Sequence, residues 1–316
     1  MWAVLATILI LTLTFGLLVS SPNPETGYIA FEAAQEGHDP LEAIELHEQQ
    51  RGEDRPITDQ YLNYMIGMAT LNWGTSFTYN TDVILVISQA WIYSAMIVIP
   101  ATILAVFFGF VIGIYSAMNQ YSKTDYAATF FAFFGISLPN FWFAIVLILV
   151  FGVFLGWFPI TYNTDNPMFS IANAVNIVLP VIVLATAAIA SEMRYARAEA
   201  LEYVRAEFVK TARAKGASES RVMIRHVFRP AMVPLITILI GDLVGIIFAT
   251  AYIVEVIFGI PGLGLVSYNA LIRQDTPLVL ATTLLPVFVA ILGNLLQDIA
   301  YTMLDPRIKY RSREVA

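Results

Sequence analysis

Six long stretches of apolar residues limit what this chain can fold into more strongly than any other feature. An α-helix rises about 1.5 Å per residue and the hydrocarbon core of a bilayer is about 30 Å thick, so each crossing needs roughly 20 apolar residues. The stretches long enough to cross are residues 2–20, 92–118, 127–157, 175–195, 231–254 and 278–304. Because 58% of the 316 residues are hydrophobic and only 13% are charged, we predict an all-α integral membrane protein with six transmembrane helices.

The first stretch could also be read as a secretory signal peptide. It has no basic segment before the apolar run, and no clear small-residue cleavage site stands around Ser20 and Ser21. We therefore expect a retained membrane helix, and the missing basic flank leaves open a start further upstream. The chain contains no cysteine, so disulfides and thiolate metal sites are excluded.

The 17 lysines and arginines indicate how the helices are oriented. If the long segment after the first stretch lies outside, only Arg51, Arg55 and Arg273 are external. The other fourteen are internal, and nine of them lie between Arg194 and Arg229. Because positive residues concentrate on the cytoplasmic side, we expect a multi-pass plasma membrane protein with both termini in the cytoplasm.

The segment 21–89 is predicted to be an acidic extracytoplasmic insertion. Residues 21–82 carry eleven carboxylates against two arginines and account for most of the net charge of −7. His38 and His47 stand among carboxylates and could bind a cation, but a solvated acidic face is the favoured interpretation. Further along, apolar residues recur every three or four positions, which predicts an amphipathic helix at the outer interface. These residues are Tyr61, Tyr64, Met65, Met68 and Leu71.

Glycine pairs one helical turn apart occur in three of the apolar stretches. The pairs are Gly109 with Gly113, Gly152 with Gly156, and Gly241 with Gly245. Such spacing allows helix backbones to approach closely in a membrane. We interpret the pairs as packing sites within the chain, with contact to a partner as the alternative.

Several kinds of chemistry are absent from the sequence. No GxxxxGK[ST] phosphate loop occurs, so any ATP must be hydrolysed by a partner chain. No HExxH zinc motif or serine with a histidine base stands within an apolar stretch. Asp242, Glu255 and Asp298 are the main candidates for an ion-coupling site, so an ion-coupled secondary transporter remains an alternative.

The basic segment between the fourth and fifth apolar stretches is long enough to fold. Helix-forming residues from Glu192 to Lys215 predict a helix that leaves the membrane, and Gly216 predicts its end. Ser218 can cap a second, short helix with Glu219 in its first turn. We interpret residues 196–229, the coupling segment, as a docking site for a soluble partner, with a generic positive cytoplasmic loop as the alternative.

The run "EYVRAEFVKTARAKGASESRVMIRHVFRPAMVP" resembles the cytoplasmic signature of permease subunits of ATP-binding-cassette importers of the dipeptide, oligopeptide and nickel group. That group reads approximately "DYVRTARAKGLS" and then "RHALRNALLP". The resemblance extends to "VEVIFGIPGLG", to "NLLQDIAYTMLDPRIKY", to "GISLPNFW" with its bend at Pro139, and to the outer segment ending in "NWGTSF". It implies the type I importer permease fold over residues 90–304.

Two parts of the sequence depart from the pattern of that group. The outer "GD" is replaced by Leu71 and Asn72, and "SPNPETG" with the acidic insertion stands where "APGDP" is usual. Both departures lie outside the coupling segment, so they bear on the substrate and on contacts with a binding protein.

The resemblance assigns two sets of site residues. The ATPase-coupling set is Gly216, Ala217, Ser218, Glu219, Arg221, Val222, Met223, Arg225 and His226, with Gly216 as the elbow and Val222 and Met223 as the apolar anchor. The extracytoplasmic gate loop comprises Glu255, Phe258, Pro261, Gly262 and Gly264, and Glu255 is expected to brace this loop. We expect Lys210 and Arg213 to pair with nearby carboxylates such as Glu207, or with lipid phosphates.

The resemblance also implies an assembly. Its members are a second homologous permease, one or two ABC ATPase subunits and an extracytoplasmic solute-binding protein, while the basic tail 305–316 contacts membrane lipid. ATP and Mg are expected on the ATPases, with no cofactor, catalytic residue, metal or nucleic acid on this chain. The expected cargo is a peptide-like small solute, and the alternatives are nickel or an oligosaccharide. A membrane-anchored scaffold is a distant third possibility.

Overall fold

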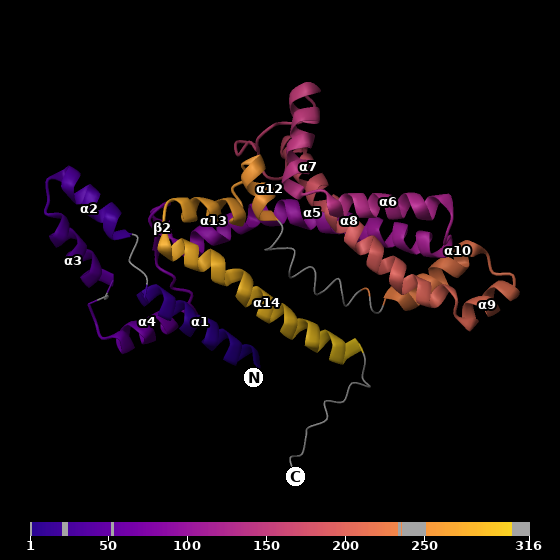
Figure 1. Cartoon of the computed structure of the whole chain (residues 1–316), viewed down its shortest axis with the longest axis horizontal. Helices are drawn as coiled ribbons and strands as arrows, with labels where there is room; N and C mark the ends of the chain where they lie inside the picture. Colours follow the sequence, from indigo (N-terminus) through magenta and orange to yellow (C-terminus); the bar gives the residue numbers. More distant parts are fainter. Residues whose placement is uncertain (1, 21–24, 52–53, 233–234, 236–250, 305–316) are drawn as a thin grey trace, which may run out of the picture. The chain divides into compact units, whose positions relative to one another are not determined.

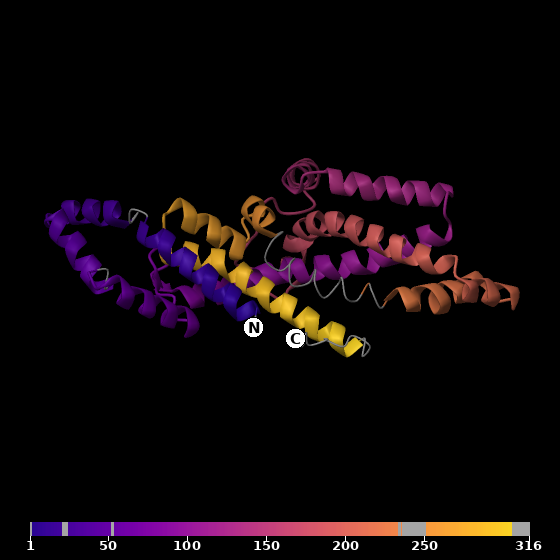
Figure 2. The same cartoon turned by 60° about the horizontal axis from the view of Figure 1, so that its bottom comes forward.

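The computed structural model describes residues 2–20, 25–51, 54–232, 235 and 251–304. The chain forms two compact units, residues 1–91 with 266–291 and residues 92–265 with 292–316. Helices make up most of the described chain in both units (Figures 1 and 2). This agrees with the all-α prediction.

Four described helices are long and apolar enough to cross a membrane. They are α1 (Trp2–Ser20), α5 (Val83–Met118), α8 (Ile171–Val204) and α14 (Thr276–Leu304). Two bent helix pairs raise the number to six when each pair counts as one span, and one of them joins α12 (Ala251–Phe258) to α13 (Leu263–Ile272). The predicted stretch 231–254 lies mostly outside the described residues.

The first unit holds short helices and a small hairpin. After α1 come α2 (Glu25–Glu36), α3 (Pro40–Arg51), α4 (Ile57–Ala69), β1 (Thr75–Ser76) and β2 (Thr81–Asp82). The two strands pair antiparallel, with Ser76 opposite Thr81. Among the described residues, no group of three or more His, Asp or Glu side chains is placed to hold a metal ion.

The amphipathic helix predicted after residue 56 is confirmed as α4. Its half-buried apolar side chains are Tyr61, Tyr64, Met65 and Met68. Phe15 of α1 packs edge-on against Tyr61 with ring centroids 5.3 Å apart, so one face of α4 covers α1. Burial raises the pKa of Tyr64 to about 12. Leu71 is an exception, because its φ of 60° ends the helix and leaves it exposed.

The second unit is built from long helices joined by sharp turns. It continues α5 with α6 (Lys123–Ser137), α7 (Asn140–Leu147), the π-helix η1 (Ile148–Phe154), α8, α9 (Glu207–Ala214), α10 (Glu219–Arg221), the π-helix η2 (Val222–Phe228) and α12. The bend implied at Pro139 is confirmed: α6 and the α7–η1 helix meet at 99°, with Leu138 extended between them. Proline restricts the residue before it to extended backbone, which ends α6 there.

Glycines allow α5 and α8 to pack closely, and Figure 1 shows the two helices running alongside each other. A Cβ on Gly109 would overlap Glu192, and one on Gly113 would lie 2.5 Å from the carbonyl oxygen of Met193. The prediction that this pair serves packing within the chain is confirmed. Gly152 instead lies against the turn that follows its own helix, with Phe158 and Ile160, and Gly241 and Gly245 lie outside the described residues.

Two large apolar clusters and a smaller one, formed by Ala132, Ala190 and Met193, hold the described part of the second unit together. One large cluster joins α5, α7, α8 and α12 around Ile97, Leu179 and Phe258. The other, the coupling cluster, joins the ends of α5 and α8 to α9 and η2, and Val209, Val222 and Val227 are completely buried in it. Side chains of α9 and η2 are therefore packed into the same core as the ends of α5 and α8.

Candidate functional site

The helix predicted over residues 192–215 is interrupted. α8 ends at Val204, Ala206 is extended with ψ of 147°, and α9 begins at Glu207. The break turns α9 so that Val209 and Ala212 are buried, which a continuous helix leaving the membrane would not allow. The guanidinium of Arg205 donates to Gln120 Oε1 at 2.8 Å beside the break.

Gly216 ends α9, as predicted. Its φ is 80°, a left-handed conformation that residues with a Cβ adopt at a cost, and an added Cβ would meet nothing within 4 Å. Backbone conformation, rather than space, is what requires glycine here. Ser218 then caps the next helix, and its Oγ accepts from Arg221 N at 3.4 Å, so this prediction is also confirmed.

The second helix of the coupling segment runs through α10 and η2, residues 219–228. Val222, predicted as an apolar anchor for the ATPase, is completely buried in the coupling cluster, which corrects that expectation. Met223 is half-buried against the same cluster. Ile224, which the sequence reasoning missed, is 61% exposed and supplies the apolar surface. Only the three-dimensional packing distinguishes which of these neighbouring apolar residues faces inward.

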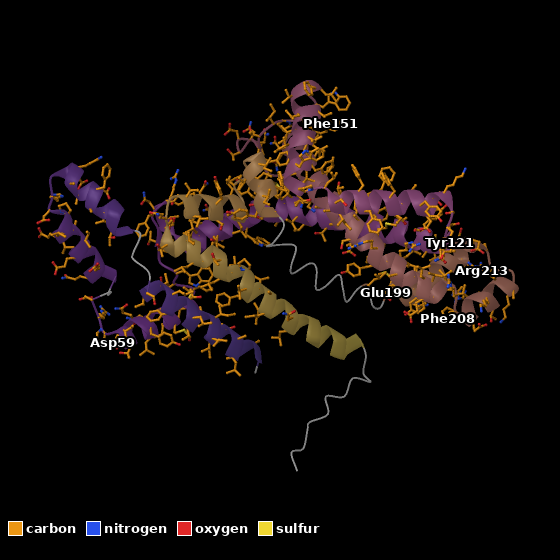
Figure 3. The ribbon with its side chains drawn as sticks, viewed as in Figure 1. Asp59, Tyr121, Phe151, Glu199, Phe208 and Arg213 are labelled. Atoms are coloured by element: carbon orange, nitrogen blue, oxygen red, sulfur yellow. The ribbon has the colours of Figure 1, made fainter. Side chains whose placement is uncertain are left out.

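Ion pairs brace the elbow from outside. Arg213 Nε lies 3.0 Å from Glu219 Oε1, and a second nitrogen of the guanidinium donates to Oε2 at 3.1 Å (Figure 3 labels Arg213). Lys210 pairs with Glu207 at 2.7 Å, as expected. Exposed pairs of this kind contribute at most about 1 kcal/mol each. Glu219 therefore links the helix after Gly216 to the helix before it. Of the other predicted residues, Arg221 and Arg225 are exposed, and His226 and Ala217 are half-buried.

A buried ion pair fixes the base of the coupling segment. Asp125, at the start of α6 and 3% exposed, accepts from Arg197 Nε at 3.0 Å and from the terminal guanidinium nitrogen at 3.1 Å. Ser116 on α5 donates to the same carboxylate, and Tyr121 N donates at 2.9 Å. The contact joins α5, α6 and α8. In the sequence, Arg197 stands out only as a positive charge, although "SKTD" is a helix-start pattern that marks Asp125.

The predicted gate loop is built around Glu255. This carboxylate is completely buried, and it accepts from Ser94 Oγ at 2.6 Å, from Gly264 N at 2.6 Å and from Leu265 N at 3.3 Å. Ser94 Oγ also accepts from Leu263 N at 2.8 Å. The expectation that Glu255 braces the loop is confirmed, because its side chain satisfies the first backbone donors of α13.

The glycines of the loop are required by close packing. A Cβ on Gly262 would lie 2.5 Å from Glu255 Oε2, and one on Gly264 would overlap the backbone of Tyr252. Gly259 has a φ of 67° and Pro261 stands two residues later, so regular structure stops there. Phe258, also predicted in the loop, is 2% exposed and serves as a core residue of α12.

The start of the loop is held by a second segment. Tyr162 N donates to the carbonyl of Phe258 at 2.8 Å, and its phenol donates to Asn173 Oδ1 at 2.7 Å. Burial raises the pKa of Tyr162.

In the first unit, Asp275 ties the β-hairpin to the start of α14. Its buried carboxylate accepts from Ser76 Oγ at 2.5 Å, from Thr78 N at 2.9 Å and from Leu278 N at 3.4 Å. Sequence reasoning missed this residue, although Asp followed by Thr and Pro is a helix-start pattern. Asp242 and the side chain of Asp298, named for ion coupling, lie outside the described residues.

Comparisons with known proteins agree with the resemblance in the sequence. Residues 109–310 match the family described as "Binding-protein-dependent transport system inner membrane component". The chain is 37% identical to the oligopeptide transport system permease protein AppB of Bacillus subtilis, over 82% of this chain and 83% of that one. It is 34% identical to the dipeptide transport system permease protein DppB of the same organism, over 99% and 97% of the two chains.

A solved structure has a similar fold. The inward-facing MetNI methionine ABC transporter matches with a TM-score of 0.55 at 13% identity, over 70% of this chain and 97% of that one.

Proposed function

Since the chain belongs to the family of binding-protein-dependent transport system inner membrane components, we propose that it is the permease subunit through which an ATP-driven importer carries peptides across the cytoplasmic membrane. Family membership makes the chain an integral membrane transport subunit, and its fold is that of a type I importer permease. Peptides are the proposed cargo because the relatives are named for oligopeptides and dipeptides.

The observation that carries the coupling mechanism is the packing of the coupling segment around Gly216. Its inner face, with Val209 and Val222, is buried in the same cluster as the ends of α5 and α8. Its outer face presents Arg221, Ile224 and Arg225. A partner ATPase that presses on the outer face therefore moves the membrane helices as well, because the two faces belong to one packed element.

Transport then follows an alternating-access cycle. Closure of the ATPases around ATP displaces the coupling segment, and the displacement shifts α8 and α5 between two discrete arrangements. The ion pair of Asp125 with Arg197 keeps α5, α6 and α8 together during this movement. The braced loop of Glu255 lies at the extracytoplasmic end and acts as a gate.

The proposed partners are a second, homologous permease, one or two ABC ATPase subunits and a solute-binding protein on the outer face. ATP and Mg bind to the ATPases, and this chain carries out no covalent chemistry and holds no cofactor. Both termini lie in the cytoplasm, because that orientation puts fourteen of the 17 cations on the inner side. The basic residues of the C-terminal tail then meet anionic lipid headgroups.

Uptake by the complete transporter in proteoliposomes tests this proposal. Labelled tri-alanine should accumulate only with ATP and the binding protein, and inactivating the partner ATPases by substitution should stop it. A scaffold role predicts no uptake under any condition. Uptake that continues with inactive ATPases and follows an ion gradient would replace the proposal with ion-coupled transport.

A further inference from the structure

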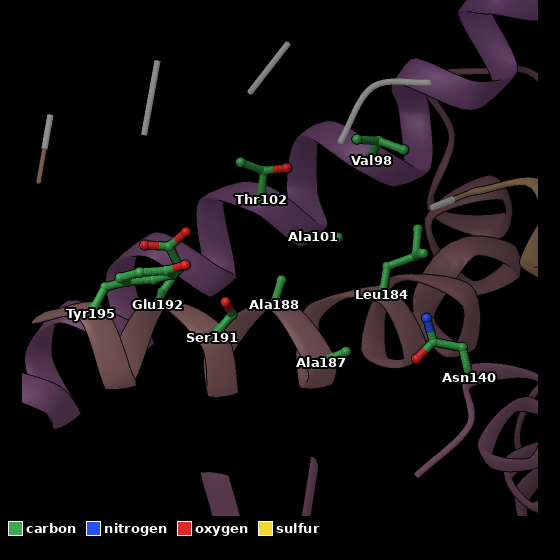
Figure 4. Close-up of a pocket in the computed structure, with 10 residues that line it drawn as sticks. All are labelled: Val98, Ala101, Thr102, Asn140, Leu184, Ala187, Ala188, Ser191, Glu192 and Tyr195. Carbon is green, nitrogen blue, oxygen red and sulfur yellow. The ribbon is translucent and has the colours of Figure 1, made fainter. Parts of the chain in front are cut away.

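A cavity of about 280 Å³ lies between α5 and α8 in the second unit, next to the start of α7. Its lining residues are Val98, Ala101, Thr102, Asn140, Leu184, Ala187, Ala188, Ser191, Glu192 and Tyr195. Most of the wall is apolar, and Figure 4 shows Glu192 and Tyr195 together at one end of the cavity and Asn140 near the other. A largely apolar pocket with a few polar groups is the usual form of a small-molecule site.

Glu192 is the acidic residue of this wall, and its side chain is 4% exposed. Gly109 explains how it comes to lie between the two helices, since any Cβ at that position of α5 would overlap Glu192 Cβ. A carboxylate in a membrane helix is costly, and such residues commonly mark the path of a substrate. The close packing at Gly109 therefore brings a carboxylate to the cavity.

Two further buried carboxylates among the described residues of the second unit belong to sites described above. Glu255 accepts from Ser94 and from two backbone amides of the gate loop. Asp125 forms the ion pair with Arg197 at the base of the coupling segment. Glu192 differs from both because it lines a cavity.

The cavity lies on the inner half of the predicted spans. Leu184 is in the middle of the stretch 175–195, and Glu192 is one turn from its end, which faces the cytoplasm in the proposed orientation. Asn140 is near the middle of the stretch 127–157. A cargo moving inward would meet Asn140 and Thr102 first and Glu192 last.

We propose that this cavity receives the protonated amino terminus of the transported peptide, with Glu192 as its counter-ion and with Thr102, Asn140 and Tyr195 as hydrogen-bonding partners of the first peptide groups. This inference rests on the proposed peptide cargo. Every unblocked peptide carries an ammonium group whatever its side chains are, so a carboxylate holds peptides independently of their sequence. A volume of about 280 Å³ accommodates roughly the first residue or two of a peptide.

The absence of cysteine from the chain provides a direct test. Thr102→Cys introduces a single thiol into the cavity wall, and the complete transporter in nanodiscs is treated with a cationic or an anionic methanethiosulfonate of similar size. The cationic reagent should react at least about tenfold faster, because Glu192 attracts it in a site of low dielectric. Tri-alanine should protect the thiol, and N-acetyl tri-alanine should protect it far less.

Variants of α8 identify the responsible group. In the Thr102→Cys background, Glu192→Gln should remove the preference for the cationic reagent, and Glu192→Asp should retain part of it. Glu202→Gln, on the exposed part of the same helix, is the matched control and should leave it unchanged. The measurement is made on assembled, purified complex, so loss of folding does not enter.

Two outcomes would overturn the inference. Equal reaction rates for the two reagents would mean that the cavity does not select cations. A thiol that neither reagent reaches would mean that another subunit covers this face. Uptake of tri-alanine, measured in parallel, tests the proposed function separately. If the wild-type transporter takes up tri-alanine and the Glu192→Gln variant does so equally well, the role of Glu192 is refuted and the proposed peptide transport is not.

Discussion

Two guanidinium nitrogens of Arg197 donate to the carboxylate of Asp125, at 3.0 and 3.1 Å. This contact links α8, which leads into the coupling segment, to the start of α6. The side chain of Asp125 is almost fully buried, whereas that of Arg197 is 28% exposed. In the proposed coupling mechanism, the pair carries movement of the coupling segment into the membrane helices.

Asp125→Asn is expected to destabilise the protein and to weaken transport. The substitution leaves Arg197 without its charged partner, and breaking a buried pair costs about 3 kcal/mol. Thermal unfolding of the purified protein measures the loss of stability. Asp165→Asn, an exposed position, is the matched control and should change little.

A double-mutant cycle checks that the ion pair is responsible. Because the two side chains act together, Asp125→Asn combined with Arg197→Gln should destabilise less than the sum of the single changes. Strict additivity would contradict the role given to the pair.

Gly216→Val should abolish uptake while the protein remains in the membrane. The φ of 80° at Gly216 imposes a cost of about 1–2 kcal/mol on a residue with a Cβ, so the elbow shifts toward another conformation. Gly216→Asn should retain much of the activity, because asparagine tolerates left-handed backbone. ATP-dependent uptake, normalised to the amount of protein in the membrane, is the measurement.

Gly37→Val provides the comparison for the elbow. Gly37 has the same φ of 80° and, like Gly216, no atom near an added Cβ, but it lies in the acidic insertion. Its substitution should leave uptake near the wild-type level. Undiminished uptake by Gly216→Val would contradict the coupling mechanism.

Much of the fold could be predicted from local patterns in the sequence. Length and hydropathy identify α1, α5, α8 and α14, because a bilayer demands long apolar runs. Gly216 and Ser218 were predicted because helix ends depend on nearby residues. The brace role of Glu255 was predicted from the resemblance of "VEVIFGIPGLG" to the family pattern, and the carboxylate indeed accepts from Gly264 N nine residues away.

The remaining site residues depend on contacts that local patterns do not contain. Arg197 and Asp125 are 72 residues apart, and Ser76 and Asp275 are 199 apart, so the chain topology alone brings them together. The orientation of Val222 was predicted wrongly because Val222, Met223 and Ile224 are all apolar, and the sequence alone does not show which of them faces the core. Distant pairs of this kind leave no mark in a single sequence.

Asp275→Asn should loosen the first turn of α14 and the β-hairpin together. The carboxylate accepts from Ser76 Oγ and from backbone amides on both sides, and an amide in its place offers a weaker acceptor and leaves a donor facing other donors. Hydrogen exchange of residues 76–80 and 276–279 should accelerate in both segments. Ser76→Ala should accelerate exchange mainly in the hairpin, and an effect of Asp275→Asn confined to α14 would contradict the link.

Gly264→Ala should disrupt the gate loop. The added methyl group would overlap the backbone of Tyr252 and lie 2.9 Å from Glu255 Oε2, so α12 and α13 must separate or the carboxylate must lose its backbone donors. Overpacking of this kind costs about 1–3 kcal/mol, and thermal unfolding together with protease cleavage around Gly259 would measure it. Gly27→Ala, in a helix where a Cβ meets nothing within 4 Å, is the control and should stabilise slightly because alanine is the better helix former. If both substitutions behaved alike, close packing around Glu255 would not be what holds the loop.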